Sequence, residues 1–207
     1  MRKILLGFEL IVLLSVPIVS VAQSAETAAP TTGTLQLEIA AFTSEVTLKP
    51  KIQKQLASGG IEWGQKGDRI VFTYVNKRFL NFDIPFLTRF GETRKLELPE
   101  GDYAITCIGF LPATAFSVEK ALSKGAYFNR NVMTVHVAAG KTTTLTMKPV
   151  IRKQATFFLT FFMPEMLASS TLDGATSPAI SINEKSSASV KWDDYVGDLK
   201  FQLGSKP

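Results

Sequence analysis

The sequence predicts an all-β protein: an antiparallel β-sandwich with one short helical insertion and a C-terminal β extension. Three observations lead to this fold class. Roughly ten short segments are rich in β-branched and aromatic residues, and turn residues separate them at intervals of about ten positions. Almost no stretch has the apolar spacing of an amphipathic helix. The chain of 207 residues, 45% of them hydrophobic, is long enough to bury a sizeable core.

The first 22 residues have the order of a secretory signal peptide. Met1–Lys3 is a short basic head, Ile4–Leu14 is an apolar run, and Ser20–Ala22 supplies small residues, after which cleavage is expected. An uncleaved membrane anchor is the alternative, because the apolar region is about long enough to span a bilayer. Glu9 and Pro17 disfavour it, since a carboxylate is costly in the bilayer and proline breaks a helix. We therefore expect an exported protein, periplasmic or extracellular.

Three further regions follow the expected signal peptide. Residues 23–34 are mostly small or polar and contain proline, which is typical of a flexible linker. Residues 35–150 hold most of the strand-like segments and are predicted to form the sandwich domain. Residues 151–207 are too short for a second sandwich and are expected to pack on the first one as a C-terminal β extension.

The individual elements are predicted from apolar alternation and from β-branched runs. Lys49–Gly60 is basic, ends in two glycines and is interpreted as a loop, whereas Ala113–Lys124 is the one credible helix. Ala155–Met163 is apolar at almost every position, which is typical of a central strand covered on both faces. The other strands are expected at residues 35–39, 70–75, 79–83 (a hairpin with the preceding strand), 94–98, 103–110, 131–138, 142–147, 179–182, 189–192 and 199–203.

Two short elements within residues 94–148 carry a family resemblance. Leu96–Thr106 (LELPEGDYAIT) has the pattern L-x-L-P-x-G-x-Y, and Val135–Thr146 (VHVAAGKTTTLT) has the pattern V-x-V-x-x-G-x-T-T-x-L. These elements resemble those of PEGA and carboxypeptidase-regulatory-like bacterial modules, which have a transthyretin-like or immunoglobulin-like topology. The resemblance implies an accessory or binding unit without a catalytic centre, with the second element as its closing hairpin. In the first element, Tyr103 follows the Pro99–Asp102 turn and can bond to the backbone upstream, as a tyrosine corner does.

Cysteine and histidine each occur once, which excludes several kinds of site. One cysteine forms neither an internal disulfide nor a cysteine-based zinc site, and Cys107 lies in a strand-like run where a buried, inert thiol is expected. One histidine excludes a multi-histidine metal centre, and His136 is interpreted as a surface residue. The net charge of +5 is spread along the chain, so nucleic-acid binding is not expected. We predict no catalytic residue, no cofactor and no metal.

The most distinctive polar and aromatic cluster is Trp192-Asp193-Asp194-Tyr195, and three interpretations are open. Together with Asp198, its carboxylates are oxygen ligands of the kind that a hard cation such as Ca²⁺ takes. Two carboxylates flanked by aromatic rings also resemble a sugar-binding or sugar-cleaving site. The third interpretation is a turn whose aromatic side chains pack on the core. We favour the turn, because adjacent aspartates of an extended segment belong to opposite faces.

Two further aromatic groups have more than one interpretation. Phe82 and Phe86, on either side of Pro85, are predicted either to line a pocket or to close one end of the sandwich. The Phe-rich run Phe157–Met163 is interpreted as part of a covered core strand, and the alternative is an exposed patch for a membrane surface or a hydrophobic partner.

These features predict an exported cell-envelope protein that acts as a non-catalytic binding or structural module. One alternative is a partner-binding subunit or inhibitor of another envelope protein. Another is a carbohydrate-binding or carbohydrate-active protein that uses the Trp192–Tyr195 region. The expected partner is another envelope protein or a saccharide, without stable membrane insertion after signal cleavage. The residues expected to contact it are Trp192, Asp193, Asp194, Tyr195, Phe82 and Phe86.

Overall fold

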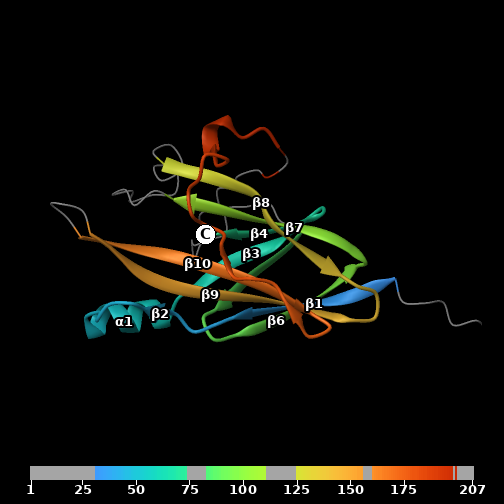
Figure 1. The fold of residues 1–207 in the computed structure, drawn as a ribbon, viewed down its shortest axis with the longest axis horizontal. Coiled ribbons are helices and arrows are strands. Elements are labelled where there is room, and N and C mark those ends of the chain that lie inside the picture. The colour runs from blue at the N-terminus through green and yellow to red at the C-terminus, as the bar shows by residue number, and fades with distance from the viewer. Residues whose placement is uncertain (1–30, 74–82, 111–124, 156–159, 198, 200–207) are drawn as a thin grey trace, which may run out of the picture.

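Two β-sheets stack face to face and enclose one apolar core (Figure 1). The computed structural model describes residues 31–73, 83–110, 125–155, 160–197 and 199. The expected signal peptide, most of the expected linker, the helix expected at Ala113–Lys124 and all but one residue of the strand expected at 79–83 lie outside the described residues. The all-β sandwich predicted from the sequence is confirmed.

The first sheet has seven strands, of which five form one continuous path. In spatial order these are β11 (Ala175–Thr176), β10 (Thr160–Leu172), β9 (Thr142–Ala155), β1 (Thr32–Ile39) and β6 (Thr93–Pro99). Two short strands lie off this path: β12 (Ile180–Ser181) pairs with β10, and β2 (Thr43–Ser44) pairs with β9.

The second sheet has six strands. In spatial order these are β13 (Val190–Lys191), β8 (Ala126–Val137), β7 (Gly101–Phe110), β4 (Arg69–Thr73), β3 (Gly60–Lys66) and β5 (Ile84–Arg89). Two short helices complete the described elements, α1 (Pro50–Ala57) and the 3-10 turn η1 (Trp192–Asp194). Neither helix has the length and apolar character that a membrane span requires, so no candidate span is found in the described segments.

Each sheet also contains parallel pairs, which the purely antiparallel prediction did not include. β9 runs parallel to β1 and to β2, and β4 runs parallel to β7. Two tight connections lead from one sheet to the other: Pro99–Gly101 joins β6 to β7, and the turn at Gly140 (φ 68°) joins β8 to β9. The closing hairpin expected over residues 135–146 is therefore wrong. Val137 and Leu145 contribute to the same core from opposite sheets.

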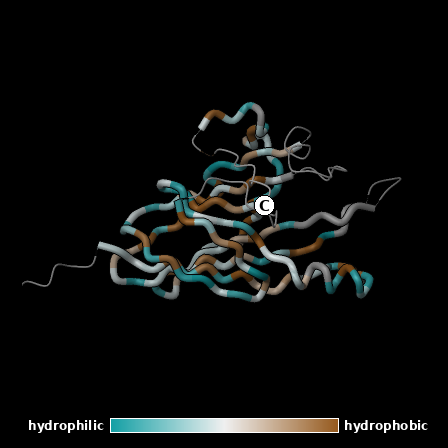
Figure 2. The backbone as a smooth tube through the Cα atoms, turned by 180° about the vertical axis from the view of Figure 1, so that it is seen from behind, coloured by the Kyte–Doolittle hydropathy of each residue, from teal (hydrophilic) through white to brown (hydrophobic). Residues whose placement is uncertain are grey.

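The core consists of the inward-facing residues of both sheets. Along β1, Leu35, Leu37 and Ile39 are buried while the residues between them are only partly buried, as the alternation predicted. The hydropathy colouring shows this alternation of apolar and polar residues along the strands (Figure 2). The largest fully buried side chains of the core are Trp63, Leu35, Leu37, Ile39, Ile61, Ile70, Phe72, Ile105, Leu145 and Met147.

The tyrosine corner expected at Tyr103 is confirmed. Its side chain is buried at the start of β7, and its hydroxyl donates a 3.0 Å hydrogen bond to the carbonyl of Pro99. Burial raises the pKa of the Tyr103 phenol above its ordinary value, so the hydroxyl remains a donor. This bond fixes the connection by which the chain passes from the first sheet to the second.

Residues Pro50–Ala57 form α1, so the loop expected over Lys49–Gly60 is wrong for most of its length. Proline suits the first position of a helix, where an N–H would have no partner, and Lys54 lies in the last turn, where a cation is favourable. The helix has only eight residues and is largely polar, so its apolar periodicity is too short to recognise in the sequence.

β3 is a strand that the sequence analysis did not predict, because glycines at positions 60 and 64 interrupt its apolar pattern. β3 is the hairpin partner of β4, across the turn at Gly67 (φ 57°), and it also pairs with β5. β4 has β3 and β7 as its neighbours. Both sides of β4 are therefore occupied by other strands along residues 69–73, and residues 79–82 of the hairpin expected with residues 70–75 lie outside the described residues.

The segment Ala155–Met163 is not one central strand. Ala155 is the last residue of β9, Thr160 is the first residue of β10, and the two residues pair with each other. The antiparallel register then runs from this pair to the pair Thr144 and Thr171, so β9 and β10 are the arms of a long hairpin. The residues between the arms, 156–159, lie outside the described residues. β9 itself runs through position 150, where the sandwich domain was expected to end.

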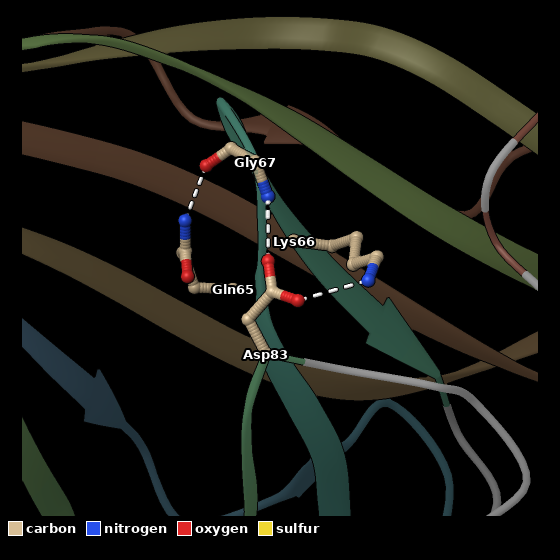
Figure 3. A network of polar contacts seen from close by, with 4 residues as sticks. All are labelled: Gln65, Lys66, Gly67 and Asp83. Atoms are coloured by element: carbon tan, nitrogen blue, oxygen red, sulfur yellow. Dashed lines mark hydrogen bonds and ion pairs between the residues drawn. The ribbon is translucent and has the colours of Figure 1, made fainter.

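A polar network joins the turn of the β3–β4 hairpin to Asp83, the residue just before β5 (Figure 3). The carboxylate of Asp83 accepts a 2.8 Å hydrogen bond from Lys66 Nζ and a 3.1 Å bond from the N–H of Gly67, and the side-chain amide of Gln65 donates to the Gly67 carbonyl. The hydrogen bond from Lys66, followed by that from Gly67, holds the pKa of the Asp83 carboxyl below its ordinary value of 3.8.

We expect Asp83→Asn to lower the melting temperature at neutral pH and to have no effect in strong acid. A depressed carboxyl pKa contributes stability above the ordinary value of 3.8, and this contribution is lost as the pH falls through the lower folded-state value. Thermal unfolding of both proteins across this pH range tests the expectation. Melting curves that differ by the same amount at every pH would contradict it.

Candidate functional site: the C-terminal strap on the second sheet

Residues 190–197, here called the C-terminal strap, lie against the outer face of the second sheet. β13 extends this sheet next to β8, where Val190 is in register with Phe128. The turn η1 then redirects the chain, and the hydroxyl of Tyr195 accepts a 3.3 Å hydrogen bond from Nη1 of Arg69, at the start of β4. The strap therefore leads from the β8 edge of the sheet toward β4. Figure 1 shows it as the red segment beside β8.

The aromatic residues of the strap pack on Phe128, which is fully buried. The Phe128 and Tyr195 ring centroids are 4.3 Å apart, and the Trp192 centroid lies 6.5 Å from that of Phe128. Trp192 and Tyr195 stack on each other with centroids 6.2 Å apart and an angle of 27° between the rings. These distances are in the range of favourable aromatic pairs. Trp192 and Tyr195 thus pack as the favoured interpretation supposed, but on the outer face of a sheet and not in the core.

Charged residues lie next to this cluster in space or in sequence. The guanidinium of the exposed Arg130 lies 4.9 Å from the Tyr195 ring centroid, which is the geometry of a cation–π contact. Asp194 is exposed and Val196 is 90% exposed, whereas Trp192 and Tyr195 are partly buried. The strap therefore presents partly exposed aromatic rings, of which Tyr195 contacts two arginines, and one exposed carboxylate in the same segment. Such a surface can stack on a ligand and hydrogen-bond to it.

The other expected contact residues do not join this cluster. Phe86, on β5, stacks on the buried Trp63 with ring centroids 4.7 Å apart, and the indole N–H of Trp63 donates a 2.9 Å bond to Thr88 Oγ1. Phe86 therefore packs against the core, on the opposite side of the second sheet from Trp192. Phe82 lies outside the described residues, and Asp193 is described in its backbone alone. Within the described residues, no three His, Cys, Asp or Glu side chains form a metal-binding group.

A row of buried residues crosses the same face of the second sheet from β3 to β8. The register places Glu62 next to Thr73, Thr73 next to Ile108, and Ile108 next to Phe128, and all four are at most 1% exposed. A carboxylate buried in such a row is a candidate functional group that the sequence analysis missed. The alternation of apolar Ile61 and Trp63 with Glu62 is the sequence signal that could have identified this carboxylate. It was overlooked because β3 was not predicted as a strand.

The chain enters the strap from residues 180–184, here called the closing segment, which connects the two sheets. β12 pairs with β10 of the first sheet, and Asn129 of β8 donates 2.9 Å hydrogen bonds to the carbonyls of Ile182 and Glu184. The hydroxyl of Tyr127 donates a 2.5 Å hydrogen bond to the Asn183 carbonyl. Burial is the main cause that raises the pKa of the Tyr127 phenol to about 12. These bonds determine where the strap begins.

The two reactive residue types lie away from the strap cluster. His136 is exposed, as expected, and its Nδ1 lies 2.8 Å from Asp102 Oδ1, opposite it on β7. Cys107 is buried, and burial raises the pKa of its thiol far above the ordinary value. The thiol therefore stays protonated and unreactive in the folded protein, as expected.

Comparisons of the chain with protein-family models, with curated proteins and with solved structures find no match. The likeness of residues 94–148 to PEGA and carboxypeptidase-regulatory-like modules therefore stays a prediction.

Proposed function

We propose that the protein is an exported, non-catalytic binding module of the cell envelope and that its C-terminal strap holds the binding surface. The cluster of Trp192 and Tyr195 over Phe128 carries this proposal, because its rings are only partly buried and lie beside the exposed Arg130 and Asp194. The signal-peptide order of residues 1–22 supports export. The resemblance of residues 94–148 to PEGA and carboxypeptidase-regulatory-like modules, which are mostly accessory or binding units, supports a role in binding.

The chemistry of the strap suits two kinds of ligand. Aromatic rings stack on the apolar faces of saccharides, and a neighbouring carboxylate and guanidinium can hydrogen-bond to hydroxyl groups. The same rings and charges also suit a protein interface, since aromatic residues and arginine are enriched at interface centres. We favour a protein partner, because Arg130 and Asp194 offer two charges of opposite sign beside an apolar centre.

An edge strand is a less suitable binding surface in this molecule. β5 pairs only with β3 among the described strands, so its other side forms an edge of the second sheet. Pro85 has no N–H to offer there, and the N–H of Arg89 already donates to Glu92 Oε2 at 3.1 Å. These two features are common ways of blocking strand addition at an edge.

The test uses a photo-crosslinking residue placed at Val196, which is 90% exposed on the strap, in protein expressed in its native envelope. We expect one stoichiometric crosslinked product from this position, and its loss when Trp192→Ala is introduced. The same residue at Lys95, exposed on β6, is the matched control and is expected to give no product. Protein purified from the envelope is expected to begin at Gln23.

Three outcomes would separate the possibilities. Products from both positions, or from neither, would count against a binding surface on the strap. Retention of a bound glycan on an array, lost with Trp192→Ala and Asp194→Asn, would assign the same surface to a saccharide. An intact N-terminus starting at Met1 would contradict the cleaved signal peptide.

A further inference from the structure

β8 departs from a regular strand where it lies beside the strap. Its register with β7 shifts there, so that residues 130–132 all lie opposite Thr106. Such a bulge bends its strand and changes the direction of the side chains on it. Arg130, the first residue of the bulge, lies on the same face of the sheet as Phe128, because every second residue of a strand belongs to one face.

Two features at this bulge are unfavourable for stability. Asn131 has a φ of 48°, a left-handed conformation that few residues other than glycine adopt. Thr106 is fully buried, and its hydroxyl has no hydrogen-bond partner among the described residues. Strained backbone of this kind is concentrated at functional sites. These features indicate that the bulge serves to place side chains such as that of Arg130 rather than to stabilise the sheet.

The Arg130 side chain is held against aromatic rings and is not paired with a carboxylate. Its guanidinium carbon lies 4.9 Å from the ring centroid of Tyr195 and 5.9 Å from that of Phe128. Arg130 forms no ion pair within the described segments, and Asp194, the exposed carboxylate of the strap, does not pair with it either. The positive charge of this exposed residue is therefore available to an external anion.

The polar groups of the two strap rings are hydrogen-bond donors as well. The indole N–H of Trp192 has no acceptor in the described part of the chain. The Tyr195 hydroxyl accepts a bond from Arg69 but donates none to the described residues. Indole and guanidinium groups only donate hydrogen bonds. One cluster thus offers donors from Arg130, Trp192 and Tyr195 without the acceptors to satisfy them.

We propose that the strap surface recognises an acidic segment of its protein partner and that a carboxylate of this segment binds Arg130. This inference rests on the proposed function, since it names the partner's chemistry at the same surface. The guanidinium donates two parallel hydrogen bonds to the carboxylate, and the Tyr195 hydroxyl supplies a further donor. The aromatic rings orient the guanidinium before the partner binds, which reduces the entropy lost on association. Val196, which is 90% exposed next to Tyr195, adds an apolar contact that suits a peptide better than a saccharide.

The test measures the yield of the crosslinked product formed from position 196 in the native envelope. Arg130→Gln is expected to reduce this yield by about tenfold or more, because it removes one partner of a charged hydrogen-bonded pair. Arg89→Gln is the matched control and is expected to leave the yield within about twofold. Arg89 is exposed on β5, at the opposite edge of the same sheet from β13. High salt is expected to lower the yield of the unsubstituted protein.

Trypsin digestion at Lys191 checks that the strap of Arg130→Gln remains in place. If the substitution releases the strap, Arg130→Lys replaces it. Lysine keeps a positive charge over the rings but lacks the paired N–H groups that bind a carboxylate, so we expect about a fivefold loss of product. A product yield that neither substitution changes would overturn the carboxylate contact and would leave the proposed function standing.

Mass spectrometry of the product identifies the crosslinked segment of the partner, in which we expect an aspartate or a glutamate. Its replacement by the matching amide is expected to reduce the yield as much as Arg130→Gln does, with no further loss when both changes are combined. A segment without an acidic residue would overturn the inference. A glycan product that Arg130→Gln removes would also overturn it, and would assign Arg130 to an acidic sugar. The absence of any product from the unsubstituted protein would contradict the proposed function itself.

Discussion

Replacing Phe128 with alanine is expected to lower the free energy of unfolding by about 3–5 kcal/mol and to release the C-terminal strap. Phe128 is fully buried, and it is the surface on which Tyr195 and Trp192 pack. The substitution removes a large buried side chain together with its ring contacts to Tyr195 and Trp192, and it leaves a cavity under the strap. This is the largest loss that we expect from a single change at the candidate site.

Urea denaturation measures the loss of stability, and limited trypsin digestion at Lys191 measures the release of the strap. Leu87→Ala is the matched control, because Leu87 belongs to the same row of the same sheet but is 48% exposed. We expect it to cost less than about 1 kcal/mol and to leave digestion unchanged. Phe128→Leu, which keeps apolar volume, should give an intermediate result. Unchanged digestion in Phe128→Ala would mean that the strap is held by other contacts.

Replacing Asn129 with alanine is expected to lower the free energy of unfolding by about 2–4 kcal/mol. Asn129 is 4% exposed and donates to the carbonyls of Ile182 and Glu184, while its Oδ1 accepts a 2.5 Å bond from Ser189. Alanine leaves the carbonyl of the buried Ile182, the carbonyl of Glu184 and the hydroxyl of the partly buried Ser189 without this partner. Because Asn129 is on the second sheet and the closing segment pairs with the first, the substitution loosens the junction between the sheets.

Hydrogen exchange of the closing segment tests this expectation directly. The N–H of Ile182 donates to the Met166 carbonyl, and its exchange is expected to accelerate in Asn129→Ala. Asn131→Gly is the control, since Asn131 is exposed and has a φ of 48°, which glycine adopts easily. We expect it to change stability by less than about 0.5 kcal/mol. Equal exchange rates at Ile182 in both variants would show that Asn129 does not hold this segment.

The candidate site could be predicted from the sequence in part. Trp192 and Tyr195 stood out as residue types, and the structure brings them together through η1. Their partner Phe128 lies more than sixty positions earlier in the chain, and no local pattern links it to them. Glu62 was missed for a related reason: glycines concealed its strand, and its burial depends on what covers that face of the sheet.

The all-β class, the inward positions of β1 and the tyrosine corner at Tyr103 follow from local sequence patterns, because residue type and period fix local backbone geometry. The sheet that each strand joins depends on long-range contacts. The turn at Gly140 has the same local chemistry whether the next strand pairs with β8 or crosses to the other sheet. Likewise, an apolar run such as Ala155–Met163 suits one central strand and the two arms of a hairpin equally. That choice depends on contacts between residues far apart in the chain, which a local pattern does not contain.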